Sequence, residues 1–273
     1  MAGLAPVRSS NAASDPWDGA SRRLECAEVW AGSERTSAIV ELPGLHAWVH
    51  STPSDSGASG GDVHYLSLCP VCTIGRIALA DVSGHGEGVA ALGERLRELM
   101  QQQLTALEQV SMMRDLNRAV LEELDGVHYA TMVAAGWQGG RGLLVLTNAG
   151  HPPPCWYRAA RGEWSWVESR GASVRGAVTG AALGLLDDVS YVRRVLRPQL
   201  GDLLVLHTDG VFEATSEADD QLGREGLMNL VRTLDTSSAA AFGRNLLSAL
   251  RRFRGSSVAT DDETIIVLER VAQ

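Results

Sequence analysis

ALADVSGHGEGVAAL, residues 78–92, passes from an apolar run into Asp81, breaks at a Gly-His-Gly tripeptide and resumes with the apolar spacing of a helix. An apolar run of this length is typical of a buried strand, and glycines at its end let the backbone turn sharply or approach a neighbour closely. The stretch therefore predicts a strand, a tight turn and an amphipathic helix, with a carboxylate placed where the strand ends.

Periodicity on both sides of this stretch predicts runs of strands separated by pairs of helices. Strands are expected at residues 36–42, 45–50, 62–69, 75–82, 128–137, 142–150, 153–158, 163–168, 190–197, 202–209 and 263–270, and helices at 86–107, 111–124, 223–234 and 237–253. Hairpin-linked strands separated by paired helices are typical of an α+β protein with antiparallel sheets, and not of a βαβ nucleotide-binding fold. The simplest arrangement is a layered sandwich in which helices cover two packed sheets.

The domain boundaries follow from composition. Residues 1–23 are rich in small and charged residues and have no apolar periodicity, which predicts a disordered N-terminal tail followed by one domain over residues 24–273. The stretch 52–61 is expected to be a loop because its residues are small and polar. A second segment rich in Gly, Ala and Ser, at about 169–184, is expected to form a mobile flap beside the functional site.

Composition excludes several classes of function. The chain has 273 residues, 45% of them hydrophobic, which is enough for one substantial core. Its formal net charge is −9 and it has no basic run, so nucleic acid is not expected as a partner. Every basic residue is arginine, which excludes mechanisms that need a phosphate-loop or Schiff-base lysine. No signal peptide or membrane-spanning run is visible, so we expect a cytoplasmic protein without membrane contact.

The four cysteines are too few for a disulfide scaffold in a chain of this length and agree with a reducing compartment. Cys69 and Cys72 form one CxxC pair between two predicted strands. A zinc site would need two further ligands at suitable spacing, and the sequence has no second pair. Packing of two small apolar side chains in a hairpin is therefore favoured over a zinc or redox role.

Four aspartates share one local context, because each lies at a boundary of a predicted strand. They are Asp62, Asp81, Asp209 and Asp261. Each one taken singly is explained as a turn former or cap. If several converge, however, their mutual repulsion must be relieved by protons or cations, and hard divalent ions such as Mg²⁺ or Mn²⁺ prefer oxygen ligands of this kind.

Five motifs together resemble a known family. Gly61-Asp62, ADVSGHGEG (80–88), TNAGHPPP (147–154), HTDGVFEA (207–214) and DDETIIVL (261–268) occur in the order and spacing of the metal-dependent (PPM-type) serine/threonine protein phosphatases. The chain is most similar to the bacterial branch related to stage II sporulation protein E and the sigma-factor regulatory phosphatases, over about residues 60–270. The resemblance implies a four-layer α-β-β-α sandwich, with two mainly antiparallel sheets flanked by helix pairs and a centre of two Mn²⁺ or Mg²⁺ ions.

The resemblance also implies roles for individual residues. Asp81 would bridge both ions and Asp62 would serve the second ion, directly or through water. Asp209 and Asp261 would hold the first ion, and the backbone carbonyl of Val82 would replace a glycine carbonyl that animal enzymes use.

Two histidines in these motifs are not assigned a definite catalytic role. For His85, general acid catalysis at the leaving serine oxygen and a turn-stabilising role both stay open. For His151, a structural loop that supports the rim of the site is favoured, since the prolines after it cannot continue a strand.

The implied reaction is hydrolysis of phosphoserine or phosphothreonine on a regulatory protein by a water between the two ions. An anti-sigma-factor antagonist in bacterial partner-switching or stress signalling would be such a substrate, and a homodimer is compatible with the sequence. Two alternatives stay open. One is an inactive phosphatase fold that regulates a partner by docking, and the other is a hydrolase of small phosphoesters.

Overall fold

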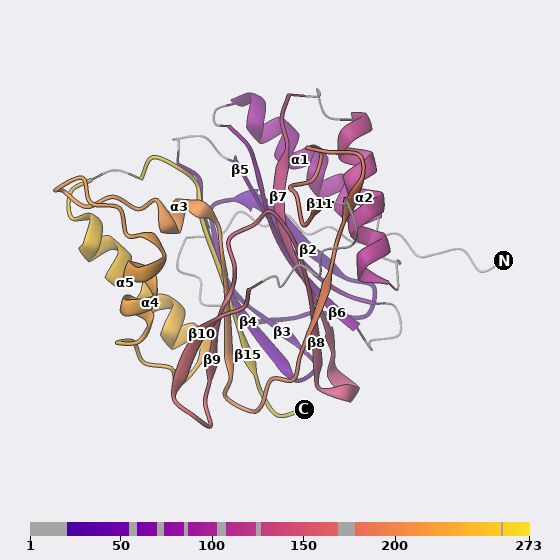
Figure 1. Cartoon of the computed structure of the whole chain (residues 1–273). Coiled ribbons are helices and arrows are strands. Elements are labelled where there is room, and N and C mark those ends of the chain that lie inside the picture. The colour runs from indigo at the N-terminus through magenta and orange to yellow at the C-terminus, as the bar shows by residue number, and fades with distance from the viewer. Residues whose placement is uncertain are drawn as a thin grey trace.

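The computed structural model describes residues 21–54, 59–69, 74–84, 87–102, 108–123, 127–168, 178–257 and 259–273. These residues form a mixed α+β fold with two main sheets and several helices, which confirms the fold class in those terms (Figure 1). Residues 1–20, His85, Cys72 and residues 169–177 of the expected flap lie outside the described residues.

Two sheets form the centre of the molecule. The seven-stranded sheet has the order β1 (Ser21–Arg23), β3 (Thr36–Leu42), β4 (Leu45–Thr52), β15 (Glu263–Arg270), β14 (Leu203–His207), β9 (Cys155–Arg158) and β10 (Glu163–Trp166). The six-stranded sheet has the order β13 (Arg193–Leu196), β8 (Leu143–Ala149), β7 (Ala130–Gln138), β6 (Ile74–Val82), β5 (Ser59–Leu68) and β2 (Val29–Glu34). Neighbouring strands pair antiparallel, except that β1 pairs parallel with β3.

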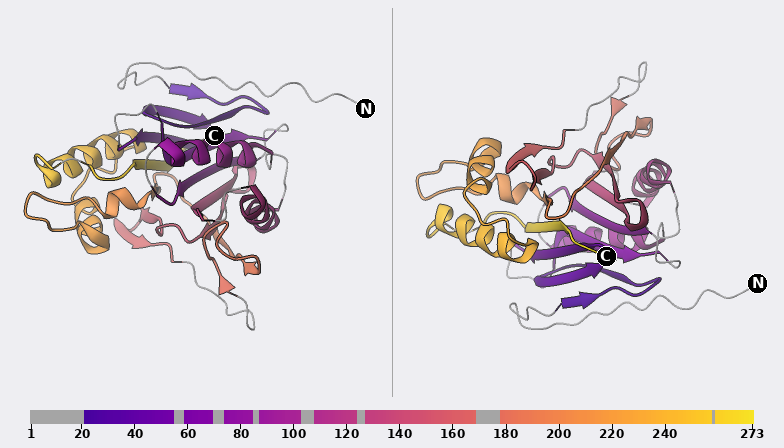
Figure 2. Two further views of the ribbon diagram at one scale, coloured as in Figure 1. Left: turned by 90° about the horizontal axis from the view of Figure 1, so that it is seen from above. Right: turned by 90° about the horizontal axis from the view of Figure 1, so that it is seen from below.

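Helices cover the outer face of each sheet, as the three views of the ribbon show (Figures 1 and 2). The helices are α1 (Glu87–Gln102), α2 (Gln109–Glu123), α3 (Asp209–Phe212), α4 (Gly223–Val231) and α5 (Ala239–Arg254), with a 3₁₀ turn, η1, at Gly139–Arg141. Two short parallel strands, β11 (Val178–Thr179) and β12 (Val189–Ser190), pair with each other in a separate two-stranded sheet.

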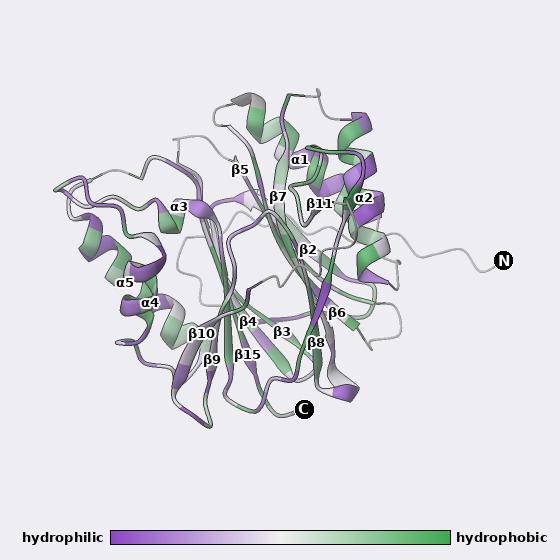
Figure 3. Ribbon diagram, in the orientation of Figure 1, coloured by the Kyte–Doolittle hydropathy of each residue, from purple (hydrophilic) through white to green (hydrophobic). Residues whose placement is uncertain are grey.

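Three apolar clusters hold these layers together. The first packs α1 and α2 on the six-stranded sheet, for example through Leu96 and Met113 against Val63. The second lies between the two sheets, and the third packs α4 and α5 on the seven-stranded sheet around Trp48 and Phe242. Figure 3 shows hydrophilic and hydrophobic residues alternating along these helices, as burial of one helix face requires. No helix among the described residues is long and apolar enough to cross a membrane.

Most predicted elements are present, with differences at their ends. The hairpin of β3 and β4 is confirmed, with Leu42 opposite Leu45 across the turn. The loop predicted over residues 52–61 is too long, because β4 continues to Thr52 and β5 begins at Ser59. Residues 21–23, assigned to the tail from sequence, pair with β3, and the sequence analysis missed β2.

The cysteines lie in different surroundings. Cys69 and Cys155 form no disulfide, and the sulfur of Cys69 accepts a hydrogen bond from the Ile74 backbone N–H at 3.1 Å. Cys26 is disulfide-bonded, which the sequence analysis did not expect.

Candidate active site

Two of the four aspartates are direct neighbours on the six-stranded sheet. Asp62 near the start of β5 lies opposite Asp81 near the end of β6, and Asp81 lies opposite Thr131 on β7. Opposed residues of an antiparallel pair point to the same face, and here that face also carries Leu66 and Leu79 of the cluster between the sheets. Asp62 is only 2% exposed, so its carboxylate is buried in the interior of the protein.

The other two aspartates come from the seven-stranded sheet. Asp209 follows β14 and begins α3, whereas Asp261 precedes β15. Because β14 and β15 are antiparallel neighbours, with His207 opposite Ile265, the end of one strand and the start of the other meet at the same edge. The tertiary structure thus brings strand boundaries from four separate parts of the chain to one edge of the sandwich.

A chain of hydroxyl groups joins the two sheets at this edge. The Thr208 hydroxyl donates to the Asp62 carboxylate at 2.8 Å and accepts from the backbone N–H of Thr264 at 3.0 Å. The side-chain oxygens of Thr264 and Ser51 are 2.8 Å apart. All four groups are buried, so these bonds fix the orientation of Asp62 in a region of low dielectric constant.

Asp262 has a role that the sequence analysis missed. Its carboxylate accepts hydrogen bonds from the backbone N–H groups of Ser54 at 2.7 Å, Gly61 at 2.6 Å and Asp62 at 3.3 Å. It therefore fixes the start of β5, and with it Asp62, to the start of β15. The signal in the sequence was the second acid of the Asp-Asp-Glu-Thr motif, which spacing alone could not distinguish from Asp261.

Glycine allows this close approach. A Cβ atom on Gly60 would overlap the Asp262 carboxylate, and one on Gly210 would overlap the backbone carbonyl of Asp262. A Cβ on Gly61 would lie 2.7 Å from a methyl group of Val89 on α1 and 3.1 Å from the Val82 carbonyl oxygen. The glycines of two motifs are therefore explained by packing around the acids.

The crowded carboxylates raise one another's pKa. Burial, together with the charges of Asp209 and Asp261, raises the pKa of Asp81 to about 8. Burial and the charge of Asp81 raise the pKa of Asp62 well above its usual value. Burial and the charge of Glu213 raise the pKa of Asp209. These pKa shifts indicate that the carboxylates of Asp62, Asp209 and Asp261 lie close enough to Asp81 to interact with its charge.

The remaining predicted site residues lie in different situations. The Val82 side chain is fully buried in the cluster under α1 and α2. His151 is buried in a loop that the Asn148 side chain holds in place. The Asn148 amide nitrogen donates to the His151 carbonyl at 2.9 Å, and the Asn148 amide oxygen accepts from the His151 backbone N–H at 2.9 Å. The Nδ1 atom of His151 lies 2.8 Å from the Thr131 hydroxyl oxygen. His85 lies outside the described residues.

The donor set agrees with a hard divalent cation in charge and ligand chemistry. Carboxylate oxygens are the preferred ligands of Mg²⁺ and Mn²⁺, and a cation would relieve the repulsion that raises these pKa values. Within the described part of the chain, no three His, Cys, Asp or Glu side chains converge so that they could hold a metal ion as they stand. The four aspartates thus lie at the same edge of the sandwich, but their side chains do not converge on one coordination site.

The two packed sheets agree with the PP2C-type fold of solved structures, and comparison with known sequences gives the family. The family profile of stage II sporulation protein E (SpoIIE) matches residues 75–271. The chain belongs to this family.

Sequence relatives agree with the assignment. The chain is 28% identical over 196 residues to the phosphoserine phosphatase RsbU of Bacillus subtilis, which covers 71% of this chain and 55% of RsbU. It is 25% identical over 198 residues to the phosphoserine phosphatase RsbP of the same organism, which covers 71% of this chain and 45% of RsbP. The chain thus spans about half the length of these relatives.

Solved structures share the fold. The RsbU and RsbW domains of Rv1364c from Mycobacterium tuberculosis superimpose with a TM-score of 0.70 at 22% identity, covering 88% of this chain and 63% of that one. RsbX in complex with magnesium has a TM-score of 0.60 at 15% identity, covering 86% and 99%. The catalytic domain of PstP with two manganese ions has a TM-score of 0.57 at 16% identity, covering 84% and 99%.

Proposed function

We propose that this protein is a metal-dependent phosphatase that hydrolyses phosphoserine or phosphothreonine on a regulatory protein. The observation that carries the proposal is the pairing of Asp62 with Asp81 on one sheet, with Asp209 and Asp261 supplied from the other. Family membership and the names of RsbU and RsbP as phosphoserine phosphatases support the same reaction class.

Four carboxylates and one carbonyl would hold the ions. Asp81 would bridge two Mn²⁺ or Mg²⁺ ions, Asp62 would serve one, and Asp209 and Asp261 would hold the other, with the Val82 carbonyl as a further ligand. When bound, such ions activate water for attack on phosphorus and neutralise charge on the phosphoryl oxygens. The metal-bound structures of RsbX and PstP support this assignment through the shared fold.

The protein's own contribution is orientation. Thr208 and the Asp262-bound backbone keep Asp62 in one orientation, so the ligand needs little rearrangement when a cation arrives. Because burial and neighbouring charges raise the pKa of Asp81 to about 8, cation binding there would release a proton near neutral pH. His85 is the proposed general acid for the leaving serine oxygen, in a motif directly after Asp81 and Val82.

The proposed substrate is a phosphorylated protein, of which an anti-sigma-factor antagonist in partner-switching is the leading example. RsbU and RsbP support the chemistry, phosphoserine hydrolysis, and not the identity of the substrate. A homodimer and a cytoplasmic location belong to the same proposal.

Hydrolysis assays test the proposal directly. The purified chain would be given p-nitrophenyl phosphate and a phosphoserine peptide with Mn²⁺, with Mg²⁺ and with EDTA, while calorimetry measures Mn²⁺ binding. We expect metal-dependent turnover that EDTA removes. Turnover of p-nitrophenyl phosphate alone would favour a small-phosphoester hydrolase. A chain that neither binds millimolar Mn²⁺ nor hydrolyses either substrate would contradict the proposal and favour an inactive docking protein.

A further inference from the structure

The motif TNAGHPPP (147–154) forms a tightly held loop after β8. The Asn148 side chain bonds both the backbone N–H and the carbonyl of His151, each at 2.9 Å. Gly150 has a φ of +71°, which a residue with a side chain rarely adopts. Three prolines follow His151 and restrict the backbone there. The loop therefore holds the His151 ring in one place.

The His151 ring connects the two sheets. Its Nδ1 atom lies 2.8 Å from the hydroxyl oxygen of Thr131 on β7. The backbone of His207, at the end of β14, interacts with the same ring. His151 is buried, and this burial, with the charge of His207, lowers its pKa to about 3. The ring is therefore neutral near pH 7, with one donor and one acceptor nitrogen. It ties Thr131 to the strand that leads into Asp209.

Thr131 is the direct neighbour of Asp81 on the adjacent strand. Asp62, Asp81 and Thr131 are opposed in turn across β5, β6 and β7, and we call these three residues the acidic row. Opposed side chains point to the same face, with Cβ atoms about 4.5–5.5 Å apart. Asp81 thus has a repelling carboxylate on one side and a hydroxyl group on the other. A hydroxyl has one donor and two acceptor sites, and His151 uses one, so Thr131 can also bond its neighbour.

Each acid of the row then has a hydroxyl group beside it that links the two sheets. The Thr208 hydroxyl comes from the seven-stranded sheet and donates to Asp62 at 2.8 Å. Thr131 comes from the six-stranded sheet, and its link to the other sheet runs through His151. Both links fix the separation between the acids of the two sheets. A cation shared by these acids needs a constant separation, because ions such as Mg²⁺ accept little variation in coordination geometry.

We propose that Thr131, held by His151, is a positioning residue that orients the Asp81 carboxylate toward the proposed metal site. The inference rests on the proposed function, because it requires Asp81 to bind a cation. Groups that hydrogen-bond or pack against a metal ligand fix its orientation, and their loss typically lowers metal affinity about 10- to 100-fold. Thr131 and His151 should act as one unit, since the ring affects Asp81 through Thr131.

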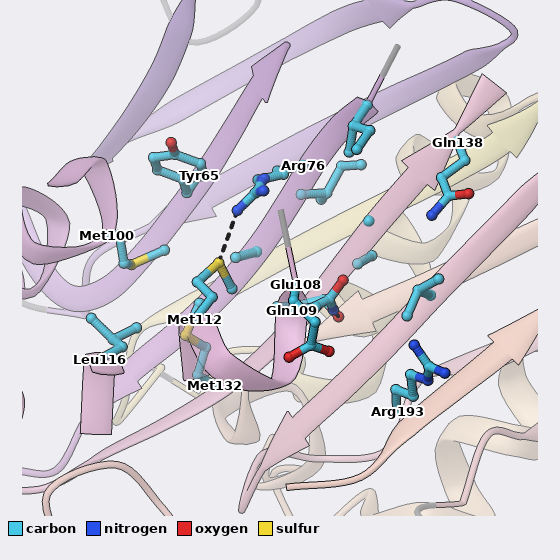
Figure 4. A pocket seen from close by; sticks show the side chains of 17 residues that line it. Tyr65, Arg76, Met100, Glu108, Gln109, Met112, Leu116, Met132, Gln138 and Arg193 are labelled. Atoms are coloured by element: carbon cyan, nitrogen blue, oxygen red, sulfur yellow. Dashed lines mark hydrogen bonds between the residues drawn. The ribbon is translucent and has the colours of Figure 1, made fainter. Parts of the chain in front are cut away.

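The opposite face of the same strands supplies a matched control. There α1 and α2 cover a cavity of about 100 Å³, where Arg76 donates a hydrogen bond at 3.1 Å to the sulfur of Met112 (Figure 4). Ala134 of β7 lines this cavity, and Thr147 of β8 lies opposite Ala134 on the same face. Thr147 is buried. Thr147→Val therefore makes the same chemical change as Thr131→Val, on the face away from the acids.

Calorimetry of the purified chain with Mn²⁺ tests the inference without measuring activity. Thr131→Val keeps the size of the side chain and removes the hydroxyl, so it should weaken Mn²⁺ binding at least about tenfold. Thr131→Ser keeps the hydroxyl and should restore most of the affinity. Thr147→Val should leave the affinity unchanged. The melting temperature in EDTA reports whether each variant is folded.

A double-mutant cycle tests the link through the ring. His151→Leu removes both ring nitrogens and should weaken Mn²⁺ binding at least as much as Thr131→Val, which gives a second test if that variant does not fold. Because the two residues act as a unit, the double variant should bind Mn²⁺ about as well as His151→Leu alone. Two losses that multiply would show that His151 does not act through Thr131, which would overturn the inference.

The failure of this inference can be distinguished from failure of the proposed function. If the wild-type chain binds Mn²⁺ and Thr131→Val binds it equally well, Thr131 does not position Asp81 and only the inference is overturned. The same holds if serine at position 131 fails to restore the affinity that valine removes, because the loss then comes from packing. A wild-type chain that binds no Mn²⁺ would overturn the proposed function together with the inference.

Discussion

Strands β5, β6 and β7 carry a polar row at each end, and the two rows differ in charge, face and support. At one end, Asp62, Asp81 and Thr131 lie side by side and face the second sheet. At the other end, residues 67, 76 and 136 lie side by side and face α1 and α2. The acidic row is negative and held by hydroxyls and backbone N–H groups, whereas the helix-side row carries the positive charge of Arg76.

The difference shows that the neighbours of a buried polar group indicate which ligand it can bind. Hydrogen bonds hold the acidic row in place, but its carboxylates still repel one another, which favours binding of a cation. The helix-side row carries a single positive charge, that of Arg76, so its groups do not repel one another in this way. The acidic row therefore predicts the charge of the ligand that would complete it.

Removing one acid should have the largest effect. Asp81→Asn should lower kcat/KM for the phosphoserine peptide by about 1000-fold, since it removes the carboxylate proposed to bridge the ions. The metal-free variant should unfold no more easily than wild type, because the substitution relieves repulsion. The exposed Asp115→Asn is the matched control and should keep full activity. Unchanged turnover in Asp81→Asn would show that the acidic row is not the catalytic site.

The packing of the acidic row is tested by Gly60→Ala. The added Cβ would overlap the Asp262 carboxylate, which three backbone N–H groups hold in place, so the free energy of unfolding should fall by about 3 kcal/mol. Gly140→Ala should change it little, since nothing lies within 4 Å of that added Cβ. Urea denaturation measures both, and equal stabilities would mean that Asp262 does not fix β5.

The pH dependence of stability is expected to depend on His50, which belongs to neither row. Burial, with smaller contributions from Arg251 and Arg35, lowers the pKa of His50 to about 4 from its usual 6.5. The unfolded chain then binds a proton that the folded chain does not, so this stability is present above pH 6.5 and is lost as pH falls toward 4. We expect a loss of about 2 kcal/mol between pH 7 and pH 4.5 that His50→Gln reduces. An identical pH profile in the variant would contradict it.

The hydroxyl support of Asp62 is tested by Thr208→Val. The variant loses a buried hydrogen bond to a carboxylate and leaves the Thr264 N–H without its acceptor, so the free energy of unfolding should fall by about 1–2 kcal/mol. Mn²⁺ affinity, measured by calorimetry, should fall about tenfold. Thr208→Ser keeps the hydroxyl and should restore affinity, whereas a serine variant as weak as valine would assign the effect to packing.

The smallest effect is expected at the helix-side row. Arg76→Met replaces a half-buried guanidinium, whose charged form is disfavoured by burial, with an apolar side chain of similar length, so the free energy of unfolding should stay within about 1 kcal/mol of wild type. Thermal and urea unfolding measure this. A large loss would mean that Arg76 is a structural cation, and the two rows would then resemble each other in support.

Much of the fold was predictable because its signals are local. Alternation predicted most strands, and the bounds expected for the last one, residues 263–270, agree with β15. The spacing of Leu92, Leu96 and Leu99 placed α1 with one face in the core. The strand β2 was missed because its sequence, VWAGSE, has weak alternation and its pairing with β5 supplies the missing stability.

The sequence by itself determined the order of strands and helices, the acids at the strand boundaries and the family that their motifs indicate. Only the tertiary structure decided that Asp262 holds the start of β5, that Thr208 orients Asp62, and that Arg76 lies over a hollow floor. The physical reason is register. Periodicity tells which face a side chain occupies, but its partners come from segments up to about 200 residues away, and only the packed sheets bring them into contact.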